Sequence, residues 1–492
     1  MDPKTDAASN GLDFDVIIIG AGISGINAAY RVQNGAPPGT SYVILESRDS
    51  MGGTWDIWRY PGIRSDSDVF TFSFAWNPWP GRESLASGEK IKRYMMESAR
   101  QAGIDRHVRL GHKVVSANWS SAAGCWEVAA RQRPQEQPQL FRGRFVFLGT
   151  GYYDYQQPLH SAIPGIDNFR GRLIAPQHWP RDYDYTGQEM VVIGSGATAI
   201  SIVPAVAGRA KHVTMLQRSP SWYFPLSQYG TIARLLAAVL PASASRRMNR
   251  YRWLLQSQLL LFVCRNMPTV AAGVLRFLTA MQLPKDADWD RDFQPRYGPW
   301  DQRLCIVMDG DLFSALRSRQ ASVVTGHIDT VAEHGIVLKS GQVLHADAIV
   351  VATGIRLKFG GDVALSVDGE PVNPCDKFAW KQCMLQDVPN LVFSFGYAEN
   401  SWTLAADCAA TVMVRVLREL QRHKMTCAAP QLDASERESM APRPLWRLTS
   451  TYLRNMASVF PKGGTGQWRP RWYYFYDVVA ATWGGLKGLA MK

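Results

Sequence analysis

The stretch 15-DVIIIGAGISG-25 decides the fold of the N-terminal part of the chain. Its aliphatic run Asp15–Ile19 is typical of a buried parallel strand, and a helical pattern follows at 26–33. The glycines between them allow a tight turn and let a pyrophosphate rest on the helix N-terminus. The next strand, expected at Tyr42–Leu45, ends in Glu46, whose carboxylate can accept hydrogen bonds from ribose hydroxyls. We therefore expect a Rossmann-like domain that binds the adenosine half of FAD.

A second unit of this kind lies far downstream. Met190–Ile193 predicts a strand, 194-GSGATA-199 the glycine turn, and residues 200–207 a helix that Pro204 interrupts. Val213–Leu216 predicts the strand that follows. A lone glycine motif is weak evidence, but strand, glycines and helix in this order predict a second dinucleotide-binding fold.

The residues after the second strand of each unit predict which nucleotide it binds. The first unit has Glu46 at this position, whereas the second has Gln217 and Arg218. A carboxylate would repel a 2′-phosphate, while a guanidinium pairs with it through charge-assisted hydrogen bonds. We therefore expect the second nucleotide to be NADPH rather than NADH. The alternative is that Arg218 is an ordinary surface arginine at a strand end.

Two further strand-like runs, Phe145–Gly151 and Ala348–Gly354, each end in a small-residue turn, and they mark where the chain crosses between the nucleotide domains. The expected fold is α/β, with two Rossmann-like dinucleotide-binding domains, for FAD and NADPH, and a helical insertion. The expected boundaries are 1–155 for the first part of the FAD-binding domain, 156–355 for the NADPH-binding domain with a helical insert at about 230–285, and 356–492 for the second part of the FAD-binding domain with a C-terminal tail.

The composition is that of a globular enzyme in a reducing compartment. Hydrophobic residues make up 46% and charged residues 20% of the 492, and the seven cysteines are scattered without a CxxC pair. This pattern indicates neither a zinc site nor a redox dithiol, and a disulfide reductase would need the cysteine pair that is missing. Met1–Leu12 lacks the apolar core of a signal peptide, and no apolar stretch reaches the roughly 18 residues of a membrane span. We expect a cytoplasmic enzyme with no metal ion and no obligate protein partner.

The net charge of +12 is unevenly spread. No acidic residue occurs between Glu189 and Asp286, whereas eleven lysines and arginines do. Such a tract suits nucleic acid, a membrane surface or a phosphate-rich cofactor, and no nucleic-acid motif accompanies it. The helical insert within this tract alternates between basic and apolar residues. It is either a plain packed helical unit or a peripheral membrane contact that collects lipophilic substrates.

A block between the two nucleotide folds, 52-GGTWDIWRYPGIRSD-66, carries a family resemblance. Its glycine-rich backbone can pass close to a flat ring, and Trp55 can pack along that ring. Together with the two glycine motifs, the block resembles the class B flavoprotein monooxygenases. Within them it is similar to the Baeyer–Villiger enzymes, particularly the branch of the ethionamide-activating monooxygenase. The resemblance covers nearly the whole chain, includes 299-PWDQRLC-305 and 401-SWTL-404, and thins after about Cys427.

The resemblance implies that one atom of O₂ enters a lipophilic ketone through a C4a-peroxyflavin, giving an ester or lactone. It implies two catalytic residues: Arg303, which stabilises developing negative charge over the flavin, and Asp66, which orients that arginine. An N- or S-oxygenating enzyme of the same fold is the alternative, and a non-oxygenating flavin NADPH oxidase is a further one.

The glycine motifs and the resemblance together give the expected cofactor-binding residues. They are Gly20, Gly22, Ser24, Gly25, Glu46, Thr54, Trp55, Asp56, Ile57, Arg64, Ser65, Asp66, Val114, Gly194, Ser195, Gly196, Ala197, Thr198, Ala199, Ile200, Gln217 and Arg218.

The chain departs from the family fingerprint FxGxxxHxxxWP at one position. Phe169, Gly171 and the pair Trp179-Pro180 keep the frame, but Ala175 stands at the histidine position. His178 is expected to be structural rather than a substitute. The departure leaves the fold and cofactors as expected, and it keeps heteroatom oxygenation open as the alternative reaction.

Strict alternation at 69-VFTFSFAW-76 predicts a strand with four aromatic side chains on one face. We expect these rings to pack in the core, the alternative being the wall of a substrate pocket.

Overall fold

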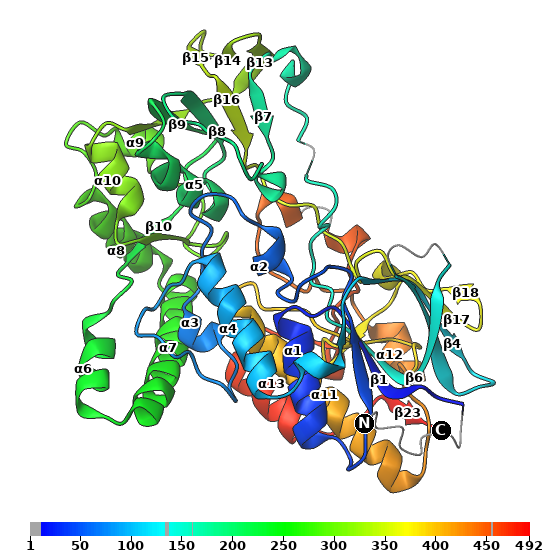
Figure 1. Cartoon of the computed structure of the whole chain (residues 1–492). Coiled ribbons are helices and arrows are strands. Elements are labelled where there is room, and N and C mark those ends of the chain that lie inside the picture. The colour runs from blue at the N-terminus through cyan, green and yellow to red at the C-terminus, as the bar shows by residue number, and fades with distance from the viewer. Residues whose placement is uncertain (1–10, 133–136, 160, 454–455) are drawn as a thin grey trace.

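The computed structural model describes residues 11–132, 137–159, 161–453 and 456–492. It has two main sheets, one mixed and one wholly parallel, each with helices packed on it, and a helical extension beside the second sheet (Figure 1). The predicted fold class, α/β with two Rossmann-like units and a helical insertion, is confirmed.

The first sheet is built around β1. Its neighbours run parallel to it, so that Ile18 lies opposite Ile44 on one side and Phe147 on the other. The parallel strands are, in spatial order, β3 (Val108–Arg109), β2 (Tyr42–Leu45), β1 (Phe14–Ile19), β6 (Gln139–Leu148) and β21 (Leu391–Phe393).

Both ends of the chain contribute to this sheet. Antiparallel strands β4 (His112–Ser120) and β5 (Cys125–Gln132) extend it from β6. Strand β17 (Ala364–Val367) then pairs with β4, and β18 (Glu370–Pro371) pairs with β17. The segment after residue 355 therefore returns to the sheet that the N-terminal segment began.

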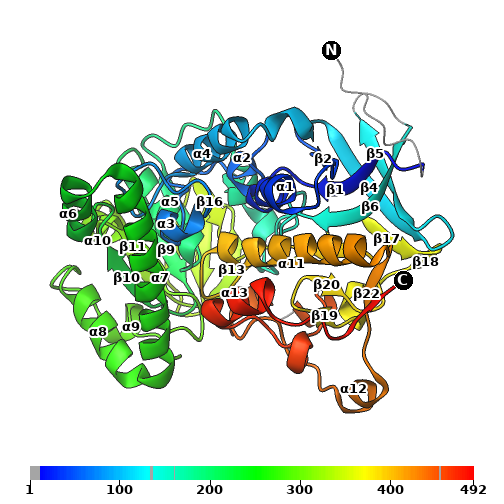
Figure 2. The same ribbon diagram turned by 90° about the horizontal axis from the view of Figure 1, so that it is seen from below.

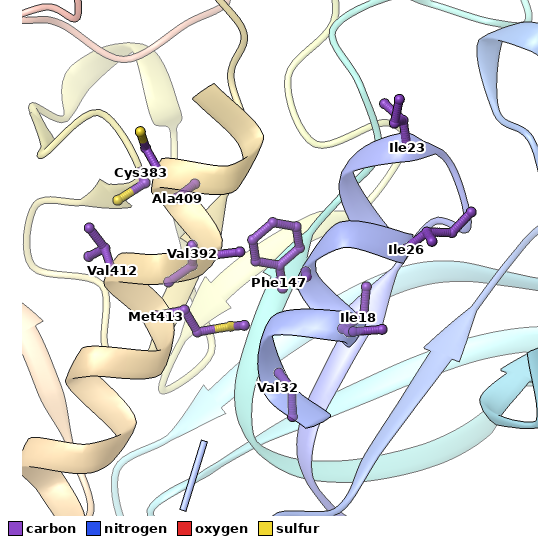
Figure 3. Packing of buried hydrophobic residues seen from close by; sticks show 14 of the residues in the cluster. Ile18, Ile23, Ile26, Val32, Phe147, Cys383, Val392, Ala409, Val412 and Met413 are labelled. Atoms are coloured by element: carbon purple, nitrogen blue, oxygen red, sulfur yellow. The ribbon is translucent and has the colours of Figure 1, made fainter. Parts of the chain in front are cut away.

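The core of this unit lies where helices α1 (Ile23–Gly35) and α11 (Trp402–His423) pack over the sheet. Phe147 and Val392 from the sheet lie between the two helices (Figure 3). The helices are also tied by polar contacts: Arg31 Nη2 lies 2.6 Å from Asp407 Oδ2. Asn27 Nδ2 donates to Asp407 Oδ1 over 3.0 Å, across a separation of 380 residues.

The second sheet is wholly parallel and matches the second glycine motif. Helices α5 (Ala197–Ala207) and α10 (Asp311–Arg317) pack against it, and a small antiparallel sheet adjoins it. The parallel strands are, in order, β12 (Ala321–Thr325), β9 (His212–Gln217), β8 (Glu189–Ile193), β16 (Ala348–Val351) and β7 (Arg172–Ile174). The small sheet comprises β13 (Ile328–Ala332), β14 (Gly335–Leu338) and β15 (Val343–His345).

The expectation that Pro204 interrupts α5 is wrong, because the helix runs through it to Ala207. Proline has no N–H for the carbonyl of Ile200, four residues earlier. Arg64 Nη2 donates to that carbonyl over 3.5 Å instead, so the bond that proline cannot make is replaced from outside the helix.

The insert begins after β10 (Tyr223–Leu226), which pairs in parallel with β11 (Cys305–Met308). Three helices follow, within the expected range: α6 (Thr231–Val239), α7 (Ala242–Asn266) and α8 (Pro268–Ala280). They lie together at one end of the molecule (Figures 1 and 2). Within the described ranges no single helix is long and apolar enough to cross a bilayer. Only α7 and α8 together meet that test, and they are bent by 115°.

The strand predicted at 69–76 is wrong. Residues Val69–Phe72 form a short helix, α3, because the buried Asp68 carboxylate caps it by accepting from the Thr71 N–H over 2.7 Å. The expected core packing is confirmed for Phe70 and Phe74, which are buried, and the Phe74 ring stacks on Trp76 with 4.6 Å between centroids. Phe72, by contrast, also lines the large cleft.

The remaining elements complete these units. They are α2 (Thr54–Ile57), α4 (Gly88–Gln101), α9 (Trp289–Asp292), β19 (Ala379–Trp380), β20 (Met384–Leu385), β22 (Ala428–Pro430), α12 (Ala434–Ser439), α13 (Tyr474–Thr482) and β23 (Leu489–Met491). Strands β19 and β20 extend the first sheet from β21.

Candidate active site

A cleft of about 1320 Å³ lies at the carboxyl ends of the central strands of both sheets. It is lined by Gly20 after β1, Gly149 after β6, Gly194 after β8 and Ala352 after β16. Open α/β sheets bind their ligands at this edge. One cleft therefore serves both glycine motifs.

The first motif presents bare backbone to the cleft. Gly22 caps α1 without a side-chain hydrogen bond, which leaves the first-turn N–H groups free for a phosphate. A Cβ on Gly22 would meet only the Cα of Gly53, at 3.6 Å. Gly25 does not line the cleft; a Cβ there would lie 1.9 Å from the Gly20 carbonyl oxygen. The third glycine therefore serves close packing of the helix on the strand.

Glu46 is fixed at the end of β2, with only 5% of its surface exposed. Its Oε2 accepts from the Ala21 N–H over 2.7 Å, and its Oε1 from the Arg48 N–H over 3.0 Å. Burial raises the pKa of Glu46, although these N–H donors act in the opposite direction. A carboxyl group held in this way at the cleft edge fits the ribose hydroxyls of a bound FAD.

The block at 52–66 forms one wall of the cleft. Trp55 lies in it and meets Phe72 edge to face at 5.7 Å. Thr54 Oγ1 lies 3.0 Å from the Tyr155 hydroxyl. The Asp56 carboxylate, by contrast, is 2.6 Å from both Lys92 and Arg48. Burial opposes its charge, but these cations outweigh burial and hold the pKa of Asp56 below its ordinary value. The Asp56 carboxylate therefore has a structural role.

The second motif opens onto the same cleft. Gly194 has φ +140°, and a Cβ there would lie 2.4 Å from the Ala352 carbonyl oxygen. Gly196 caps α5 without a side-chain hydrogen bond, and a Cβ on it would meet nothing within 4 Å. The N-terminus of α5 therefore faces open space with its N–H groups available, as a pyrophosphate requires.

Gln217, the last residue of β9, and Arg218, which follows it, point in different directions. Arg218 is exposed, lines the cleft, and donates to Thr451 Oγ1 over 3.1 Å. Gln217 points away into the protein, where its Nε2 donates to the Asp292 carbonyl over 2.7 Å. Ala199 is likewise buried beneath the turn.

Most of the predicted cofactor-binding residues line the cleft. They are Gly20, Gly22, Ser24, Glu46, Thr54, Trp55, Asp56, Ile57, Arg64, Ser65, Asp66, Val114, Gly194, Ser195, Gly196, Ala197, Thr198, Ile200 and Arg218. The side chain of Arg64 is engaged with Asp311, with Arg64 Nη2 3.3 Å from Asp311 Oδ1.

Arg303 and Asp66, expected to act together, are brought together in the cleft. Arg303 Nη1 lies 3.4 Å from Asp66 Oδ2, and 30% of the arginine side chain is exposed to the cleft. Burial opposes the charge on Arg303, but the Asp66 carboxylate, together with the hydroxyls of three neighbouring tyrosines, raises the arginine's pKa. The guanidinium is therefore a permanent positive charge with a fixed partner.

Three tyrosines beside this pair were not predicted from the sequence: Tyr152, Tyr153 and Tyr452. The hydroxyls of Tyr152 and Tyr153 are hydrogen-bonded to each other, and Tyr152 stacks on Trp402 with 4.8 Å between centroids. Burial raises the pKa of all three, so they are neutral phenols at physiological pH. The signal that could have found two of them is the run 151-GYYDY-155, directly after a strand that ends at the cleft.

Ala175 and His178 lie beside the cleft rather than in its lining. Ala175 precedes a short 3₁₀ turn at 176–178, and His178 is exposed. Between them Gln177 is buried and donates to the Asp154 carbonyl over 2.8 Å, which ties the turn to the segment that crosses between the sheets. Within the described ranges there is no cluster of side chains able to hold a metal ion.

Comparison with known proteins identifies the family. The model of the flavin-binding monooxygenase-like family matches residues 14–232. The FAD-containing monooxygenase EthA of Mycolicibacterium smegmatis is 40% identical over 467 residues, which is 94% of each chain. A steroid monooxygenase solved with NADP has a TM-score of 0.75 at 19% identity and covers 97% of this chain and 99% of its own. OTEMO, solved with FAD and NADP, has a TM-score of 0.74 at 18% identity, covering 98% and 100%.

The two structural likenesses, at under 20% identity, speak for the fold alone. The likeness to EthA carries more, because the identity is 40% and extends over almost the whole of both chains. It confirms the predicted family and enzyme class, a flavoprotein monooxygenase with FAD as its cofactor. The chain belongs to the flavin-binding monooxygenase-like family.

Proposed function

We propose that this enzyme uses FAD and NADPH to insert one atom of O₂ into a lipophilic ketone, giving an ester or lactone. We further propose that residues before 155 and after 356 hold FAD, and that residues 156–355 hold NADPH. The seven cysteines are all free, which fits action in the cytoplasm.

The observation that carries the proposal is the ion pair of Arg303 and Asp66 in the cleft shared by both glycine motifs. When bound, the two nucleotides supply hydride transfer and O₂ activation. Arg303 then stabilises negative charge that develops on the reacting oxygen atoms and on the substrate carbonyl. Asp66 keeps the guanidinium oriented, since the arginine would otherwise sample other rotamers in an open cleft.

The neutral tyrosines complete this environment. Tyr152 is buried against the ring of Trp402, and the partly buried Tyr153 stacks on the ring of Trp58, so they exclude water from one side of the ion pair. A phenol can donate a hydrogen bond without adding negative charge near the reacting oxygen. Such surroundings favour transfer of oxygen to substrate over release of H₂O₂.

The test is ester formation by Arg303→Ala and Arg303→Lys with a panel of lipophilic ketones. Loss of one preorganised electrostatic donor costs about 10²–10³ in rate. The alanine variant should therefore bind FAD, oxidise NADPH and release H₂O₂ in place of ester. The lysine variant, which keeps the charge but not the planar fork, should lie between it and the wild type. Arg209→Ala, which removes an exposed arginine paired with Asp184 over 2.9 Å, is the matched control.

Ester formation by Arg303→Ala within about twofold of the wild type would remove Arg303 from the proposed mechanism. The second candidate function is N- or S-oxygenation, and Ala175 in the fingerprint favours it. A wild-type enzyme that oxidises thioethers or amines but no ketone would establish that function. Ala175→His would then test whether the fingerprint position controls the choice. H₂O₂ with no oxygenated product from any substrate would indicate a flavin oxidase.

A further inference from the structure

The outer face of α7 is apolar. Its exposed side chains Met248, Tyr251, Leu255, Leu259 and Phe262 follow one another at intervals of three and four residues and are each between 50% and 63% exposed. This spacing forms a single stripe along the helix. In a globular protein such a stripe normally faces the core. Here it faces outward.

The inner face of the same helix is, in part, polar. Asn249 and Arg250 are buried, and Arg250 Nη1 donates to the carbonyls of Phe70 over 2.8 Å and Ser73 over 2.9 Å. Gln258 Nε2 donates to Asn400 Oδ1 over 2.5 Å. These bonds fix the rotation of α7, so the helix cannot turn its apolar stripe inward.

The neighbouring helices continue the pattern. Helix α7 contacts both α6 and α8, and the three form one projecting unit (Figures 1 and 2). Each neighbour has its own exposed stripe at the same spacing. On α6 the residues are Ile232, Leu235 and Val239. On α8 they are Val270, Val274 and Phe277, followed by Met281 directly after the helix. All are between 48% and 75% exposed. We call the exposed apolar side chains of α6, α7 and α8, with Met281, the insert face.

The exposed charge on the three insert helices is of one sign. No acidic residue occurs between Glu189 and Asp286. The exposed charged residues on the three helices are the arginines Arg234, Arg247 and Arg276. A second copy of the chain docked face to face would bring these cations together, which costs free energy. An anionic lipid surface would attract them and would also accept the apolar side chains.

We propose that the insert face docks the enzyme reversibly on the surface of an anionic bilayer. Leucine, valine and phenylalanine side chains enter the interfacial layer, and the arginines pair with lipid phosphates. The helices lie on the bilayer and do not cross it. Helix α7 also contacts the cleft wall through Asn400, so one helix separates the lipid from the cleft. This inference goes beyond the proposed reaction and does not depend on it.

The test is flotation of the FAD-loaded enzyme with vesicles of phosphatidylglycerol and phosphatidylcholine in equal amounts, compared with phosphatidylcholine alone. We expect binding to the anionic vesicles that weakens as salt is added. The double variant Leu259→Glu with Phe262→Glu should lower the vesicle partition coefficient by at least about tenfold, because it places two anions at the interface. Leu140→Glu with Val343→Glu is the matched control, since both side chains are 50% exposed on other elements. It should bind like the wild type.

A second double variant, Arg234→Gln with Arg247→Gln, replaces two exposed arginines by polar side chains and tests the charge alone. It should bind more weakly and with a shallower dependence on salt. FAD absorbance and the thermal midpoint should be unchanged in all variants. Two results would overturn the proposal. One is wild-type binding no stronger than that of the glutamate variant. The other is a lipid-free dimer, seen by light scattering, that the glutamate variant dissociates; this would assign the face to a second copy.

Discussion

Replacing Arg218 with alanine should separate the two nicotinamide coenzymes. Arg218 lies in the cleft beside the second glycine motif, and its hydrogen-bond acceptor is the neutral Thr451 hydroxyl at 3.1 Å. The guanidinium is thus not neutralised by that contact and can pair with a 2′-phosphate. A hydrogen bond to a charged group is worth about 1.5–3 kcal/mol. Arg218→Ala should therefore raise KM for NADPH roughly ten- to a hundredfold.

The contact with Thr451 must be separated from the contact with phosphate. Removing a neutral hydrogen bond of this kind costs about 1 kcal/mol and would affect both coenzymes equally. Thr451→Val removes it while leaving Arg218 in place, so it is the matched control. Steady-state NADPH and NADH oxidation should be measured for the wild type and both variants. Equal losses with the two coenzymes in Arg218→Ala would refute the assignment and make this arginine structural.

Three other substitutions test the cleft and the core. Gly22→Val should give a folded but colourless protein. Its Cβ would contact only Gly53, and the rest of the side chain would occupy the space that the pyrophosphate of FAD needs. An unchanged flavin spectrum would contradict this prediction. Gly196→Val should keep FAD and the thermal midpoint but lose NADPH-driven flavin reduction, because its Cβ enters open cleft. Asp477 accepts from the Tyr397 hydroxyl over 2.8 Å, and burial raises its pKa to about 6, above the ordinary 3.8. The folded state therefore binds the proton more tightly than the unfolded state, and this stabilising effect is present below pH 3.8 and lost as pH rises through 6. Relative to Asp477→Asn, the wild type should lose thermal stability between pH 4 and 7; parallel melting curves would exclude the effect.

The two nucleotide-binding units could be predicted because their signals are local. Strand, glycine turn and helix follow within about twenty residues, and the backbone of Gly20 or Gly194 adopts angles that other residues disfavour. The pairing of Arg303 with Asp66 is different. Nothing in their spacing brings them together, and the expectation came from resemblance to a family.

The sequence predictions that were wrong or incomplete also have physical explanations. Alternation at 69–76 is compatible with a strand, but Asp68 offers a cap that starts a helix instead. Gln217 follows the strand pattern of β9, so its side chain turns into the domain while Arg218 turns out. The tyrosines near Arg303 were missed because aromatic residues after a strand are usual in cores. Their place in the cleft depends on packing between distant segments, such as Tyr152 on Trp402.

The packing of α1 against α11 has a consequence for biosynthesis. Asp407, the partner of Asn27 and Arg31, leaves the ribosome 380 residues after Asn27. At 5–20 residues per second, this delay is about 20 to 80 s. Until then one side of α1 has no covering helix, while the whole segment that carries the second glycine motif is synthesised and can fold. A nascent chain stalled before α11 should therefore be recognised by chaperones as unfinished, even with its second domain complete.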